Sequence, residues 1–192
     1  SLSPTLGMGK VEGALLDTLA FQSHRYPDVD MPYLLNQIAG WQAAKAKLPT
    51  WAANEDIIYP PHLSMEQCSS EQTADYKLQL AARLLTTATG VNDASHALSQ
   101  IVPGSLLVDL TGGFGVDFSF ISRCFERAVY VEQQEKLCEV AQHNFQVLGL
   151  SQVEVVHADS TEYLHSLSHA TLIYLDPARR NEQGGKTVHQ MS

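Results

Sequence analysis

The chain has 192 residues, of which 44% are hydrophobic and 17% are charged, a composition typical of one globular domain with a small appendage. Its formal net charge of −9 argues against a broad surface for nucleic acid or anionic membranes, because such surfaces are rich in Lys and Arg, although a local basic patch is compatible with it. Cys68, Cys124 and Cys138 are widely spaced and form no CxxC pair, so neither a disulfide framework nor a zinc site is indicated. With no long apolar run and no signal-peptide pattern, we predict a cytoplasmic protein without membrane association.

Residues 1–66 predict a helical N-terminal region. Apolar residues recur at helical spacing in two stretches, and the second stretch lies between Pro32 and Pro49. The following segment, residues 51–63, contains two adjacent prolines and is expected to be an extended linker.

Residues 67–192 predict a second region of a different kind. Ser69, followed three residues later by Gln72, has the pattern of a capping box, and the helix that it opens should end near Gly90. A shorter helix is expected over residues 94–101. Four apolar runs then alternate with helical patterns, at residues 106–110, 128–132, 153–158 and 171–176. This alternation predicts an α/β domain with a parallel sheet and helices on both faces.

A glycine-rich turn follows the first of these strands. The apolar run ends in Asp109, and Gly112, Gly113 and Gly115 precede an amphipathic helical pattern. Glycine allows the backbone to approach a ligand closely, and the N-terminus of the next helix offers unpaired N–H groups. The turn therefore predicts a site for a nucleotide-like ligand.

An acidic residue lies at or just after the end of each predicted strand. These residues are Asp109, Glu132, Asp159 and Asp176. Each alone could be the N-cap of the next helix, but ligands in such sheets bind outside the carboxyl ends of the strands, where all four would lie.

Glu132 is the most informative of the four, because a carboxylate at the end of the second strand can accept hydrogen bonds from both hydroxyls of a ribose. The ligand would then contain adenosine. A dinucleotide fingerprint requires a third glycine where Phe118 stands, and Asp117 would repel a pyrophosphate. The sulfonium and ammonium of S-adenosylmethionine would instead be attracted to Asp109 and Asp117, which favours that cofactor.

The motifs in this order resemble those of class I S-adenosylmethionine-dependent methyltransferases. The similarity covers about residues 66–180 and rests on VDLTGGFGVD at 108–117, VYVE at 129–132, HAD at 157–159 and DPARR at 176–180. Together with EQCSSEQTADYK at 66–77, they resemble a bacterial family of such enzymes that carry a THUMP-like domain after the catalytic domain. The resemblance implies a Rossmann-like sheet with strand order 3-2-1-4.

The resemblance also implies residue roles. Asp176, Pro177 and Arg179 would be catalytic, Glu132 would bind the ribose, and Asp159 with Ser160 would contact the adenine. The full cofactor-binding set would be Asp109, Thr111, Gly112, Gly113, Phe114, Gly115, Asp117, Glu132, Gln133, Asp159 and Ser160. No metal is implied, and the His165 and His169 pair is better explained as solvated.

The loop that begins at Asp176 departs from the amino-methylating pattern. Relatives of that kind have a second proline and then an aromatic residue, where this chain has Ala178 and Arg179. The aromatic partner for a flipped base is therefore missing. Arg179 and Arg180 have two interpretations that stay open, recognition of a phosphate or carboxylate and attachment of the loop to a nearby acid.

A methyltransferase sheet has more strands than the four predicted here, and each further βα step takes about 30 residues. We therefore expect domain 67–192 to be truncated after strand four, with that strand's edge covered by another copy of the chain or by the terminal tail. The leading hypothesis is an S-adenosylmethionine-dependent methyltransferase, with RNA as the acceptor implied by the resemblance. An NAD-dependent oxidoreductase and a non-catalytic nucleoside-binding module are the alternatives.

Overall fold

The computed structural model describes residues 17, 18, 20, 27–89 and 101–177. The chain divides into two compact units, Ser1–Glu66 and Gln67–Ser192. The helix expected over residues 94–101 lies almost wholly outside the described residues. Within the described ranges, no helix combines the length and the apolar character needed to cross a membrane.

The first unit contains α2 (Met31–Lys47), α3 (Pro49–Ala52) and α4 (His62–Gln67). Asp30 caps α2 by accepting a hydrogen bond from the backbone N–H of Tyr33 at 3.0 Å. The predicted linker is wrong at its two ends, which lie in α3 and α4, and Trp51 in α3 is fully buried, while residues 53–61 form neither helix nor strand. The side chain of Gln37 donates to the carbonyl of Tyr59 and accepts from its N–H, which satisfies that backbone inside the unit.

The second unit is built on a parallel sheet of four strands in the order β3-β2-β1-β4. Its strands are β1 (Val102–Asp109), β2 (Phe125–Glu132), β3 (Val153–His157) and β4 (Leu172–Tyr174). The predicted order 3-2-1-4 is therefore confirmed. Asp109 is paired in register with Tyr130 of β2 and with Tyr174 of β4, so the carboxyl ends of these strands lie at one edge.

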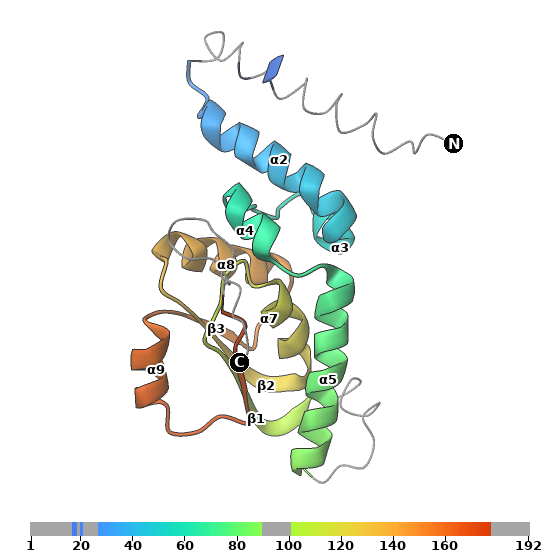
Figure 1. Ribbon diagram of the computed structural model, residues 1–192, viewed down its shortest axis with the longest axis vertical. Coiled ribbons are helices and arrows are strands. Elements are labelled where there is room, and N and C mark those ends of the chain that lie inside the picture. The colour runs from blue at the N-terminus through green and yellow to red at the C-terminus, as the bar shows by residue number, and fades with distance from the viewer. Residues whose placement is uncertain (1–16, 19, 21–26, 90–100, 178–192) are drawn as a thin grey trace, which may run out of the picture. The chain divides into compact units, whose positions relative to one another are not determined.

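Helices cover both faces of the sheet, as predicted (Figure 1). They are α5 (Glu71–Thr89), α7 (Val116–Ile121), α8 (Glu135–Val147) and α9 (Ser160–Ser166), with a 3₁₀ turn at Ser122–Cys124 after α7. Leu107 and Val108 are neighbours in β1 and point to opposite faces, and each belongs to a different core. The larger core lies under α5, α7 and α8, and the smaller one faces the partly buried Tyr163 and Leu167 at α9.

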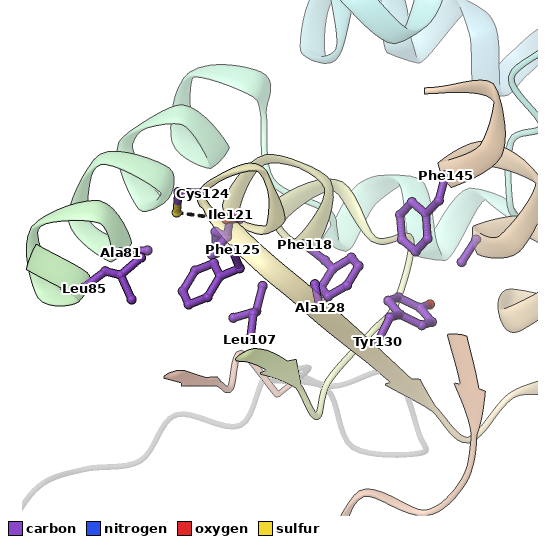
Figure 2. Packing of buried hydrophobic residues seen from close by; sticks show 11 residues of the cluster. Ala81, Leu85, Leu107, Phe118, Ile121, Cys124, Phe125, Ala128, Tyr130 and Phe145 are labelled. Atoms are coloured by element: carbon purple, nitrogen blue, oxygen red, sulfur yellow. Dashed lines mark hydrogen bonds between the residues drawn. The ribbon is translucent and has the colours of Figure 1, made fainter. Parts of the chain in front are cut away.

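The larger core is rich in aromatic residues (Figure 2). It consists of Ala81, Leu85, Leu107, Phe118, Ile121, Cys124, Phe125, Ala128, Tyr130, Ala141 and Phe145. Helix α5 contributes Ala81 and Leu85, which lie one turn apart on the same side of the helix. Burial of these two side chains fixes α5 against α7 and β2.

The start of α5 differs from the predicted capping box. The helix begins at Glu71, and the backbone N–H of Thr73 donates to Oγ of Ser70 at 3.2 Å. Ser70, and not Ser69, therefore caps the helix. The hydroxyl of Ser69 donates instead to Asp117, at a distance of 3.0 Å.

Strand β4 lies at the end of the sheet among the described residues and pairs with β1. Ile173 in β4 and Leu175 just after it are both exposed. Cover for this edge, by a second copy or by the tail, stays a prediction.

Candidate functional site

The glycine turn joins β1 to α7 and is packed directly on aromatic side chains. Gly113 and Gly115 have φ values of 61° and 80°, a region that favours glycine. A Cβ on Gly112 would lie 2.5 Å from Cζ of Tyr130, and one on Gly115 would lie 2.7 Å from Cζ of Phe145. Gly112 and Gly115 are thus required by close contact, and Gly113 by its backbone conformation.

The aromatic side chains under the turn support one another. The rings of Phe118, Tyr130 and Phe145 pack in tilted or edge-on pairs, with centroids 5.2 to 5.6 Å apart. The hydroxyl of Tyr130 donates a hydrogen bond to the carbonyl of Gly113. Burial, followed by the negative charges of Glu132 and Asp109, raises the pKa of this hydroxyl, so it stays a donor. Phe114 of the turn is itself buried.

Glu132 ends β2 beside the glycine turn and is only 9% exposed. Its Oε2 accepts from the backbone N–H of Gly113, and its Oε1 accepts from that of Gln134, both at 2.9 Å. A carboxylate oxygen has two acceptor positions, so one position on each oxygen is left for a ligand by the residues that the structure describes. The neighbouring Gln133 is exposed, and its carbonyl lies 3.0 Å from Nε2 of His157.

Asp109 ends β1 and is 2% exposed. Its Oδ1 accepts hydrogen bonds from the backbone N–H and the hydroxyl of Thr111, at 2.8 and 3.1 Å. Burial raises the pKa of Asp109 to about 7, and the charges of Asp117 and Glu132 act in the same direction, although the Thr111 hydrogen bonds lower it. This carboxyl group therefore changes its charge near neutral pH.

Thr111 also connects the glycine turn to the segment after β4. Its Oγ1 accepts a hydrogen bond from the backbone N–H of Asp176 at 2.9 Å. The carbonyl of Tyr174 accepts from the N–H of Leu110 at 3.1 Å. Asp176 is thus held close to the turn, and Pro177, which follows it, is exposed. Their catalytic role stays a prediction. Arg179 lies outside the described residues.

Lys77 of α5 joins this arrangement, although it is not among the site residues predicted from the sequence. Its Nζ lies 2.7 Å from Oδ2 of Asp117 and 3.0 Å from Oδ2 of Asp176. The sequence did contain a signal. Lys77 lies four and eight residues before Ala81 and Leu85, so this charged residue is on the apolar face of the helix. A lysine on such a face is expected to reach a polar partner at the edge of the core.

Comparisons with known proteins identify the family. The sequence profile of the family described as conserved hypothetical protein 95 matches residues 92–192, which is just over half of the chain. The chain belongs to this family. No curated protein matches the chain.

One solved structure resembles this member of the conserved hypothetical protein 95 family over most of the length of the present chain. It is a crystal structure from Porphyromonas gingivalis W83, provisionally assigned as a methyltransferase, with 28% identity and a TM-score of 0.54 over 72% of this chain. The chain spans about a third of that longer protein, because the match covers 31% of it. This likeness and the strand order show the Rossmann-like methyltransferase fold.

A second structure is the C-terminal domain of precorrin-6Y C5,15-methyltransferase from Rhodobacter capsulatus. It is 25% identical, matches 43% of this chain and 45% of its own, and has a TM-score of 0.37. A similarity of that size says nothing further about the fold.

Two other predicted site residues of this family member lie at the start of α9. Asp159 is the N-cap of that helix and accepts from the backbone N–H groups of Thr161 and Glu162, at 2.8 and 3.1 Å. Ser160 is the first residue of the helix. The structure thus gives Asp159 the capping role that any acid after a strand can have. Its contact with an adenine stays a prediction.

Proposed function

We propose that this conserved hypothetical protein 95 family member is an S-adenosylmethionine-dependent methyltransferase. The observation that carries the proposal is the place of Glu132, at the end of β2 and hydrogen-bonded to the glycine turn through the N–H of Gly113. In Rossmann-like folds, an acid there binds the ribose of an adenosine ligand. The fold shared with the Porphyromonas gingivalis protein supports the same conclusion.

The residues present fit this cofactor. The free acceptor positions of Glu132 match two ribose hydroxyls, and the glycine turn offers its backbone to the ligand. Asp117 has a buried Oδ1 with no hydrogen-bond partner among the described residues, which suits a positively charged donor such as the methionine ammonium.

Electrostatics also favour a cationic ligand. The site contains the acids Asp109, Asp117, Glu132 and Asp176, and Lys77 is the cation that contacts two of them. The pyrophosphate of a dinucleotide would be repelled by this group, whereas a sulfonium would be attracted to it. The balance of charge argues against the NAD-dependent alternative.

Glu132 and the glycine turn would hold S-adenosylmethionine, which would supply a methyl group to the acceptor atom and keep the electron pair of the broken bond on its sulfur, while the proton of the acceptor would go to water. The protein's part is to position the acceptor. The carboxylate of Asp176 can accept a hydrogen bond from an acceptor N–H, and its backbone is held by Thr111. Pro177 restricts the backbone that follows.

We propose RNA as the acceptor class, on the basis of the resemblance to the family with a THUMP-like domain. Arg179 and Arg180, which follow Asp176 closely in the sequence, are side chains of the kind that bind phosphate. They would provide a local basic contact on a chain of net charge −9. Labelled donor, incubated separately with total RNA and with protein from source cells lacking the gene, tests this assignment.

Calorimetric titration with S-adenosylhomocysteine tests the cofactor. The unaltered protein and Glu139→Ala, a change at an exposed acid of α8, should bind alike, and Glu132→Ala should bind about tenfold or more weakly. Tighter binding of NAD would favour the oxidoreductase, and binding without transfer to RNA or protein would favour the nucleoside-binding module. Absence of binding, or binding unaffected by Glu132→Ala, would contradict the proposal.

A further inference from the structure

The ammonium of Lys77 lies where side chains from separate parts of the second unit meet. Its Nζ donates to Asp117 and Tyr174 at 2.7 Å, to Asp176 at 3.0 Å and to Ser69 at 3.1 Å. Asp117 lies in the first turn of α7, Tyr174 ends β4, and Asp176 follows it. One side chain thus joins the glycine-turn helix to the motif after β4.

Core packing fixes the place from which Lys77 reaches these groups. Ala81 and Leu85 follow it at intervals of one turn and are buried against the side chains of α7 and β2 (Figure 2). The side chain of Lys77 is 23% exposed, whereas that of Asp176 is 53% exposed. The rigid partner in this ion pair is therefore the lysine, and the carboxylate of Asp176 is the group that gains order from it.

The acceptors around Nζ of Lys77 differ in how many other hydrogen-bond donors they have. An ammonium has three N–H groups, so the four acceptors around Nζ compete for them. The hydroxyl of Tyr174 has one proton to give, and it lies 2.9 Å from Oδ2 of Asp117 and 3.3 Å from Oδ2 of Asp176. Asp117 also receives a hydrogen bond from Ser69. Lys77 is thus the closest donor to the carboxylate of Asp176, since the Tyr174 hydroxyl is farther away and lies nearer to Asp117.

The charge of Lys77 is maintained by the same contacts. Burial lowers the pKa of the ammonium, but the hydrogen bonds to Asp117, Tyr174 and Asp176 outweigh burial and raise the pKa above its ordinary value. Lys77 is therefore a cation at every pH at which the protein would work.

We propose that Lys77 is a positioning residue for methyl transfer, which holds the Asp176 carboxylate by Oδ2 and leaves Oδ1 to accept a hydrogen bond from the methyl acceptor. This inference rests on the proposed function. Among the described residues, no hydrogen bond engages Oδ1 of Asp176. The competing explanation is that Lys77 only ties α5 to the sheet, in which case its loss would affect stability and not the reaction specifically.

Hydrogen exchange tests the positioning without any need for activity. We compare Lys77→Met, Lys77→Arg and a control, Lys136→Met, which changes an exposed lysine of α8. Exchange at residues 172–176 should be about tenfold faster in Lys77→Met, partly restored in Lys77→Arg and unchanged in the control, with β1 and β2 unaffected. Unchanged exchange in this segment, or equal acceleration throughout the unit, would overturn the inference.

Kinetics with the fraction that the unaltered protein methylates separate positioning from a structural role. Lys77→Met should lower kcat about tenfold while KM for S-adenosylmethionine changes less than about threefold, and Lys77→Arg should recover part of the loss. Because Lys77 acts through Asp176, the double variant Lys77→Met with Asp176→Asn should be no slower than the slower single variant. Losses that multiply, or a lower melting temperature with unchanged kcat, would overturn the inference.

The two proposals fail in different ways. If the unaltered protein neither binds S-adenosylhomocysteine nor transfers a methyl group, the proposed function is wrong, and the role of Lys77 falls with it. If the unaltered protein is active and Lys77→Met is equally active, only the inference about Lys77 is wrong.

Discussion

The backbone N–H of Gly113 donates a hydrogen bond to Oε2 of Glu132 at 2.9 Å, which joins the glycine turn to the end of the neighbouring strand. The carboxylate proposed to bind the ribose therefore also stabilises the backbone that would approach the rest of the cofactor. Its Oε1 accepts in the same way from the N–H of Gln134. Substitutions of Glu132 are expected to affect binding and local stability together.

Comparison of Glu132→Gln with Glu132→Ala separates these two effects. The amide of Gln keeps one oxygen that can accept from Gly113, but its NH₂ group cannot accept from Gln134 or from a ribose hydroxyl. We expect the melting temperature of Glu132→Gln to stay close to that of the unaltered protein. S-adenosylhomocysteine should bind to this variant about tenfold more weakly, since a hydrogen bond to a charged group is worth about 1.5–3 kcal/mol. Glu132→Ala should have both a lower melting temperature and a weaker affinity for S-adenosylhomocysteine. Calorimetry and thermal denaturation measure this, with Glu139→Gln as the control, and wild-type affinity in Glu132→Gln would contradict it.

Gly113 and Gly115 of the turn should differ in their tolerance of alanine. A Cβ on Gly115 would lie 2.7 Å from a carbon of Phe145, which is buried, and the backbone there has φ of 80°. At Gly113 the nearest atom to a Cβ is the Thr111 carbonyl oxygen at 3.6 Å, so only the left-handed conformation opposes the change. Gly113→Ala should cost about 1–2 kcal/mol of unfolding free energy, and Gly115→Ala about 1–3 kcal/mol more. Urea denaturation measures both, and equal losses would show that Phe145 can yield.

Much of the fold could be predicted because its signals are local in the sequence. A βαβ unit imposes a fixed order and spacing on an apolar run, a turn and a second strand. The chain shows this spacing in the apolar run before Asp109, the glycines after it and the acid Glu132, and the sheet has the expected order. The contacts of Ser69 and Lys77 with Asp117 could not be predicted, because they depend on how α5 packs beside α7. Asp159 was ambiguous for another reason, since a helix cap and an adenine contact require the same residue type.

The same limit applies in the first unit. Two adjacent prolines indicated an extended linker, but the burial of Trp51 and Tyr59 and the hydrogen bond of Tyr59 with Gln37 of α2 are tertiary features. Turn-forming residues predict where a helix ends, but they do not predict whether the segment that follows is buried against the rest of the unit.

The proposed site should rank its ligands by charge. S-adenosylmethionine carries a sulfonium that S-adenosylhomocysteine lacks, and the site has Asp117, Glu132 and Asp176, together with Asp109, whose pKa of about 7 leaves it partly protonated at neutral pH, against the cation of Lys77. A difference of one unit charge near these acids is worth about 1 kcal/mol or more, so we expect S-adenosylmethionine to bind about fivefold or more tightly, with NAD weakest. The difference in affinity between S-adenosylmethionine and S-adenosylhomocysteine should become smaller as the ionic strength rises, because salt screens the partly exposed charges. Calorimetry at low and high salt measures it, and equal affinities at low salt would count against an electrostatic preference.

Asp109 should make stability depend on pH in a defined direction. Burial raises its pKa from 3.8 to about 7, so between about pH 4 and pH 7 the folded protein holds a proton that the unfolded chain has released. The favourable contribution of the protonated form is therefore fully present below about pH 4 and is lost as the pH rises towards about 7.

Asp109→Asn tests this dependence, because it keeps an oxygen for the two Thr111 donors and removes the charge. The variant should flatten the slope of stability against pH. At pH above about 7 it should be the more stable protein, by at most about 1.4 kcal/mol for each pH unit between the folded and unfolded pKa values, and the advantage should vanish in acid. Urea denaturation across this pH range measures the difference, and Asp75→Asn, at an exposed acid of α5, should keep the wild-type slope. An unchanged slope in Asp109→Asn would mean that Asp109 is ionised in the folded protein throughout.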